Sequence, residues 1–262
     1  MRRSRGPLPE SDASVDALSD EDRKWLSFAW AGRADSELTA CLSFGVVAEA
    51  LRGAGEEPAL IELAERAIED ERYHSQICHR LASIYLGAEA PAPKAHTLTV
   101  PAHPGAPEEV RRTLHVLGQC CFNETTGSVF YELCLKGAKS GPARAGLLSL
   151  LSDEVDHARI GWAHISSERL SPSVREAIRP WMGALVENNL RAWRGRYALP
   201  DRPSLLEHGC PSYDGGYAAV ITALDEIIIP GLASFGFRID QVARRARAQV
   251  EQGSPFENRT PD

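Results

Sequence analysis

The pentapeptide DERYH at 70–74 returns as DEVDH at 153–157, and these two copies decide the expected fold of the chain. In each copy a glutamate and a histidine stand three positions apart, so on a helix their side chains project from one face. Each copy lies in a segment whose apolar residues recur at helical spacing. The repeat therefore predicts two helices that each turn a Glu-x-x-His pair toward a common interior.

A lone glutamate on another helical segment precedes each copy. Glu37 comes 34 residues before Glu71, and Glu124 comes 30 residues before Glu154. In both cases a tight turn lies about midway, so two antiparallel helices rising 1.5 Å per residue place the paired glutamates at nearly the same height. Four carboxylates and two imidazoles are therefore expected to converge. Such donors bind iron or manganese, and four carboxylates neutralise two divalent ions.

The remaining pattern predicts an all-α fold of two antiparallel helical hairpins. An extended crossover is expected at 87–107, where five prolines occur without a sustained period. A short amphipathic stretch at 22–30 is expected to lie across the bundle, and a capping box at Ser173 and Glu176 predicts a further helix to about 196. The other helices are expected at about 35–52, 57–85, 107–136, 142–169, 217–234 and 238–251.

Composition and pattern divide the chain into four parts. Residues 1–20 are rich in Arg, Pro, Ser and Asp and are expected to form a mobile tail. The four-helix bundle is assigned to 21–170, a helical extension packed on it to 171–252, and a second tail to 253–262.

The doubled motif with its level glutamates resembles that of the ferritin-like superfamily, specifically its carboxylate-bridged di-iron proteins, over about residues 35–168. The resemblance implies a bundle with a long crossover and two iron ions, with manganese–iron or two manganese ions as alternatives. Glu71 and Glu154 would bridge the metals, and dioxygen would be the co-substrate. The implied metal-binding and catalytic residues are Glu37, Glu71 and His74 on one ion and Glu124, Glu154 and His157 on the other.

Asp70 and Asp153 each stand four residues before a motif histidine. We expect each to accept the ring N–H of the histidine on the other motif helix, which would fix its tautomer. The alternative is a solvated acidic residue on the shoulder of a helix.

The net charge and the apolar pattern of the sequence argue against two classes of partner, nucleic acids and membranes. The 262 residues carry a net charge of −7 without a basic stripe, which argues against nucleic-acid binding. The start MRRSRGPLPESDAS has no apolar stretch behind its arginines, and the most apolar segment, 227–237, contains Pro230. No membrane association is therefore expected. Six cysteines without a CxxC pair indicate buried thiols in a reducing compartment, so a cytoplasmic location is predicted.

The resemblance favours a dioxygen-dependent oxidase or oxygenase that hydroxylates, N-oxygenates or desaturates a small organic substrate, with an external electron donor. Helices beyond 170 favour an enzyme because a substrate pocket must be roofed. A ferroxidase or iron store, a rubrerythrin-like peroxide reductase and a non-catalytic metal-stabilised bundle are the alternatives. Leu150 departs from the histidine of arylamine N-oxygenases, whereas the glutamate spacing resembles that of aldehyde-deformylating oxygenases. A homodimer is compatible with the sequence.

Overall fold

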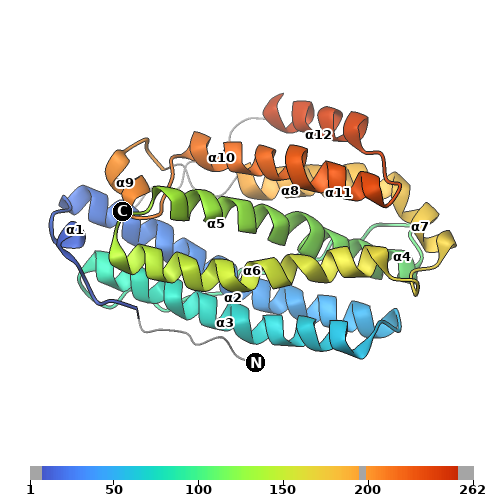
Figure 1. The fold of residues 1–262 in the computed structure, drawn as a ribbon, viewed down its shortest axis with the longest axis horizontal. Coiled ribbons are helices and arrows are strands. Elements are labelled where there is room, and N and C mark those ends of the chain that lie inside the picture. Colours follow the sequence, from blue (N-terminus) through green and yellow to red (C-terminus); the bar gives the residue numbers. More distant parts are fainter. Residues whose placement is uncertain (1–7, 195–198, 253–262) are drawn as a thin grey trace.

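The computed structural model describes residues 8–194 and 199–252, and within these residues every regular element of secondary structure is a helix. Figure 1 shows the long helices stacked side by side along one axis. The bundle consists of α1 (Ala13–Asp16), α2 (Asp20–Gly53), α3 (Pro58–Leu86), α4 (Glu108–Val116), the π-helix η1 (Leu117–Glu124), α5 (Thr125–Gly137) and α6 (Gly141–Ser166). The remaining elements are α7 (Pro172–Ile178), the 3₁₀-helix η2 (Arg179–Trp181), α8 (Met182–Arg194), α9 (Pro203–Glu207), α10 (Tyr213–Thr222), the π-helix η3 (Ala223–Ile228), α11 (Ile229–Ser234) and α12 (Asp240–Gln252).

The first hairpin pairs α2 with α3. The predicted break between a short stretch at 22–30 and a helix at 35–52 is wrong, because α2 runs unbroken for 34 residues from its N-cap Ser19. A single glycine, Gly32, is the only weak helix former between them, and one glycine costs only about 1 kcal/mol. Helix α3 begins at Pro58 and ends before Gly87, whose left-handed φ of 72° is a common helix stop.

The second hairpin pairs the continuous run α4–η1–α5 with α6. The extended crossover at 87–107, which the prolines predicted, connects it to the first hairpin. The middle of the first arm, η1, is π-helical, which the sequence analysis did not anticipate. Gly161 lets α6 approach this segment closely, because a Cβ there would lie 2.7 Å from the backbone nitrogen of Cys121. The close approach packs α6 directly against η1, the segment that ends at Glu124.

Along α2, α3 and α6, most of the apolar core residues fall into two clusters. One cluster lies toward the end that carries Trp30, Leu81 and Leu147. The other lies toward the opposite end and includes Phe44 and Ile160. On α2, α3 and α6, the acidic and histidine residues of interest fall between these two clusters. The polar cluster is therefore enclosed by apolar packing on both sides.

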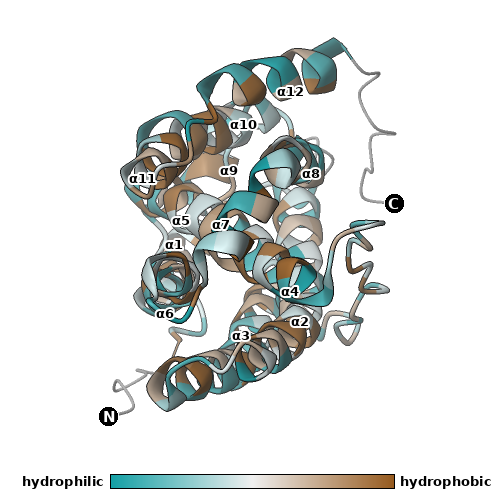
Figure 2. Cartoon of the chain, turned by 90° about the vertical axis from the view of Figure 1, so that its right-hand side faces the viewer, coloured by the Kyte–Doolittle hydropathy of each residue, from teal (hydrophilic) through white to brown (hydrophobic). Residues whose placement is uncertain are grey.

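The C-terminal helices pack against the α4–α5 arm, on the side away from α2 and α3 (Figures 1 and 2). Helix α7 opens at Ser171, whose hydroxyl accepts from the Val174 backbone N–H at 3.3 Å, and not at the predicted cap Ser173. Pro172 explains the difference, since proline favours the first helical position directly after the cap. In Figure 2 hydrophilic residues lie along the outward side of α12, the outermost of these helices.

The N-terminal segment from residue 8 onward is ordered against the bundle, which corrects the predicted tail at 1–20. Asp12 caps α1 and also accepts from the Gly141 backbone N–H at 2.5 Å. Val15 is buried in the core. Residues 1–7 and the predicted tail at 253–262 lie outside the described residues.

The apolar segment at the C-terminal end is longer than expected. Tyr213–Ser234 is one helical run of 22 residues that contains an 18-residue window with a mean hydropathy of 1.4, which by length and composition is enough to cross a membrane. The π-helical turns of η3 directly precede Pro230, which would interrupt a regular α-helical ladder. One face of this run, with Val220, Leu224 and Ile228, is buried against the bundle.

Candidate metal centre

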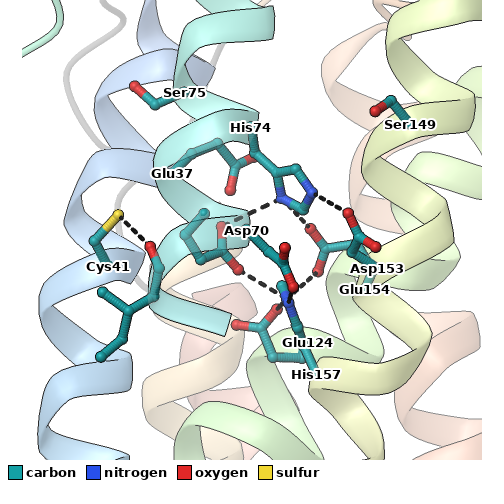
Figure 3. Close-up of polar contacts among 12 residues, drawn as sticks. Glu37, Cys41, Asp70, His74, Ser75, Glu124, Ser149, Asp153, Glu154 and His157 are labelled. Carbon is teal, nitrogen blue, oxygen red and sulfur yellow. Dashed lines mark hydrogen bonds and ion pairs between the residues drawn. The ribbon is translucent and has the colours of Figure 1, made fainter. Parts of the chain in front are cut away.

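Six acidic and histidine side chains from four helical segments converge in the middle of the bundle (Figure 3). All six are buried, with exposed fractions from 0% to 7%. Their potential ligand atoms form two groups, each within 4.8 Å: Glu37, Glu71, His74 and Glu154 in one, and Glu71, Glu124, Glu154 and His157 in the other. The structure thus brings together the six residues singled out from the sequence.

Glu71 and Glu154 belong to both groups, and each directs one carboxylate oxygen toward each histidine. Glu71 Oε2 lies 3.5 Å from His74 Nδ1, and Glu71 Oε1 lies 2.9 Å from His157 Nδ1. Glu154 Oε1 lies 3.4 Å from His74 Nδ1, and Glu154 Oε2 lies 3.9 Å from His157 Nδ1. This is the placement that two bridging carboxylates would need.

The two histidines have the same orientation. Their Nδ1 atoms face the carboxylate cluster and their Nε2 atoms face away from it, toward the aspartates. His74 Nε2 lies 3.3 Å from Asp153 Oδ2, and His157 Nε2 lies 3.7 Å from Asp70 Oδ2. Each aspartate thus lies beside the histidine of the opposite motif helix, in the position expected from the sequence. In His74, where Nε2–H can donate to Asp153, Nδ1 is the nitrogen available to a metal. In His157, Nε2 makes only an ion-pairing contact with Asp70, and Nδ1 again faces the carboxylates.

The π-helix η1 places two side-chain amides beside Glu124, and neither was predicted from the sequence. Gln119 Nε2 donates a hydrogen bond to Glu124 Oε1, and Asn123 Nδ2 lies 3.3 Å from the same oxygen. On an α-helix, residues five apart do not face each other, but π-helical turns follow an i to i+5 pattern. The π-helical geometry therefore turns Gln119 and Glu124 into neighbours.

The other single glutamate is held from α5. The hydroxyl of Tyr131 donates to Glu37 Oε1. The guanidinium of the buried Arg33 lies 5.9 Å from the Tyr131 ring centroid and donates to the Gly209 carbonyl at 2.9 Å. Both single glutamates thus carry a hydrogen-bond donor on one oxygen, which restricts how each carboxylate can turn.

Burial and crowding shift the pKa values of this cluster. Burial, reinforced by Glu71 and Glu154, raises the pKa of Glu37 and of Glu124 well above the ordinary value. Burial would also raise the pKa of Glu71, but its two imidazole neighbours hold it below the ordinary value. Burial alone would lower the pKa of His157, yet Asp70 and Glu71 raise it to about 10, and the pKa of His74 is raised in the same way.

The donor set fits a pair of metal ions. Both oxygens of Glu71, Nδ1 of His74 and both ring nitrogens of His157 are buried without a well-aligned hydrogen bond, although carboxylates lie within ion-pairing distance. Buried polar atoms are rarely left in this state unless an ion or water completes them. Oxygen and imidazole donors without a thiolate suit iron or manganese. All six cysteines are buried and free, and none belongs to either ligand group of the described residues.

Comparisons with known proteins give information on the fold of the chain. No protein-family model matches the chain, and no curated protein matches it. A solved structure described as protein 19 with aldehyde deformylating oxidase activity from Synechococcus is similar, with a TM-score of 0.50 and 17% identity over 94% of this chain and 100% of that chain. The chain has a ferritin-like helical bundle. Its buried carboxylate–histidine cluster fits a di-iron site.

The role of the aspartates can be tested with Asp153→Asn. Because an amide is a weaker acceptor than a carboxylate, we expect this variant to bind Mn²⁺ roughly 10- to 100-fold more weakly, measured by competition with a chelator. Glu69→Gln is the control, because Glu69 precedes Asp70 on α3 but its side chain is 59% exposed and pairs with Arg72 at 2.6 Å. Equal affinities for Asp153→Asn and the parent chain would refute the orienting role.

Proposed function

We propose that this chain is a non-haem di-iron oxidoreductase that uses dioxygen to oxidise a small organic substrate. The observation that carries the proposal is the pair of four-ligand groups sharing Glu71 and Glu154 in the buried centre of the bundle. The structural neighbour is described as having aldehyde deformylating oxidase activity, which belongs to the same broad class of reaction. The proposed ligands are Glu37, Glu71, His74, Glu124, Glu154 and His157.

Two reduced iron ions, when bound, would supply electrons and open coordination positions for dioxygen. The protein's own contribution is to hold the ligands and exclude water. Asp70 and Asp153 orient the two imidazoles through Nε2. Tyr131 fixes Glu37, and Gln119 fixes Glu124, so little rearrangement is needed when metal enters. The apolar clusters at both ends of the site keep bulk water from the reacting groups.

The test is dioxygen uptake by the reduced, iron-loaded protein. The chain is loaded with Fe²⁺ without air, mixed with oxygenated buffer and followed with an oxygen electrode and by optical spectroscopy. We expect uptake in proportion to the iron bound, and repeated uptake when a protein electron donor and a substrate are supplied. Metal that binds without any dioxygen uptake would contradict the proposal and indicate a structural role for the metal.

Iron storage gives a different result in the same experiment. A ferroxidase would continue to take up dioxygen as more Fe²⁺ is added, with no organic substrate, and would accumulate ferric mineral. Under the proposed function, uptake without substrate stops once the bound iron is oxidised. Glu154→Ala serves as the control for oxidation of free Fe²⁺ in the buffer.

A further inference from the structure

A cavity of about 210 Å³ lies beside the candidate metal centre, between α2, the crossover, α4–η1 and α8. Its walls combine aliphatic side chains such as Val46 and Leu185 with four side-chain amides. The amides belong to Gln119, Asn123, Asn188 and Asn189. This mixture of an apolar surface with a few polar groups is typical of sites for small organic ligands.

Two of these amides connect the cavity to the metal centre. Gln119 and Asn123 both line the cavity, and both direct an amide nitrogen at Glu124 Oε1. Their oxygens are held as well, since Gln119 Oε1 accepts from Ser43 at 2.7 Å and Asn123 Oδ1 accepts from Trp193 Nε1 at 3.1 Å. A ligand in the cavity is thus separated from Glu124 by a single layer of fixed amides.

The cavity favours an uncharged ligand. None of the described residues that line it is Asp, Glu, Lys or Arg. Its two titratable lining residues are His103 and His115. Burial and the neighbouring His115 lower the pKa of His103, so the His103 imidazole is neutral at pH 7. A charged ligand would lose its hydration without gaining a counterion, which is costly.

Size and hydrogen bonding define the ligand further. An apolar cavity of about 150 Å³ accepts benzene, so this cavity holds roughly eight or nine non-hydrogen atoms. Asn189 is buried, and its Oδ1 accepts from Thr126 Oγ1 at 3.4 Å. Because Asn189 also lines the cavity, its side-chain amide can supply an N–H donor to a ligand oxygen.

We infer that this cavity binds the organic substrate, an uncharged molecule about the size of one substituted aromatic ring that carries a carbonyl, amide or hydroxyl oxygen. That this ligand is the substrate of the chain rests on the proposed function. The binding itself requires no metal, so it can be measured separately.

Three probes of nearly equal shape test the inference: benzamide, benzoate and benzylammonium. Each is titrated into the full-length metal-free protein by ligand-observed NMR or calorimetry. We expect benzamide to bind at least about tenfold more tightly than either ion, because only the ions lose a charged group's hydration. Equal binding of all three, or no binding of benzamide, would overturn the inference.

Substitutions that place a larger side chain in the cavity test whether benzamide binds there. Val46→Phe places a ring in the cavity wall and is expected to weaken benzamide binding at least about tenfold. Leu42→Phe is the matched control, because Leu42 lies one turn earlier on α2 and is 49% exposed. If Val46→Phe does not fold, Ala192→Phe at the exposed rim of the cavity replaces it. Unchanged affinity in a folded cavity variant would place the ligand elsewhere and refute the inference.

The two proposals fail in different ways. Benzamide binding that is sensitive to Val46→Phe, without dioxygen uptake by the iron-loaded protein, would support the cavity and refute the oxidase. Dioxygen uptake without benzamide binding would support the oxidase and refute this ligand class.

Discussion

Replacing Glu71 or Glu154 with alanine is expected to leave a chain that no longer holds two metal ions. Each carboxylate directs one oxygen toward each half of the site, so each replacement removes a ligand from both four-ligand groups at once. Loss of Glu37 or Glu124 would affect one group only. The measurement is metal content per chain after loading with Mn²⁺ and gel filtration, where we expect a fall from about two to below one.

The matched control is Glu69→Ala. Glu69 lies two residues before Glu71 on α3, but its side chain is 59% exposed and pairs with Arg72. Metal content should stay at the parent level in this variant, and circular dichroism should show the same helix content in all three. Two metals retained per folded chain in Glu71→Ala or Glu154→Ala would refute the bridging role.

The arrangement of the ligands could be predicted because it depends on simple helical counting. Glu37 and Glu71 lie about equally far from the turn between α2 and α3, and Glu124 and Glu154 about equally far from the next turn. Antiparallel packing then brings each pair level, whatever the details of the turns. The π-helix does not disturb this, because η1 ends at Glu124 and the segment between Glu124 and the turn, α5, is an α-helix.

The surroundings of the ligands could not be predicted in the same way. Gln119 reaches Glu124 only because η1 is π-helical, and a search at spacings of three and four residues does not find this pair. Tyr131 reaches Glu37 across 94 positions of sequence, so its role depends on how α5 packs against α2. One missed feature did have a signal, since Pro172 marks Ser171 as the helix cap.

Metal binding is expected to release protons at pH 7. In the metal-free centre, a pKa of about 10 keeps His157 charged at this pH, and the raised pKa values of Glu37, Glu124 and His74 favour their protonated forms. Coordination requires deprotonated carboxylates and neutral imidazoles, so the protons bound to these side chains must leave. Calorimetric titration with Mn²⁺ in buffers of different ionisation enthalpy counts them. Binding without proton release would contradict this description of the metal-free site.

The raised pKa values also determine how the stability of the metal-free protein depends on pH. Groups whose pKa is raised by folding stabilise the metal-free protein below their unfolded pKa, and this contribution is lost as pH rises through the folded value. For His157 that loss extends from about 6.5 to about 10, and Glu37 and Glu124 act in the same direction from about 4.5 upward. Each displaced proton changes metal affinity by about 1.4 kcal/mol per pH unit. The difference in Tm between Mn²⁺-loaded and metal-free protein should therefore widen from pH 6 to pH 8, and a constant difference would show that protons and metal do not compete for these side chains.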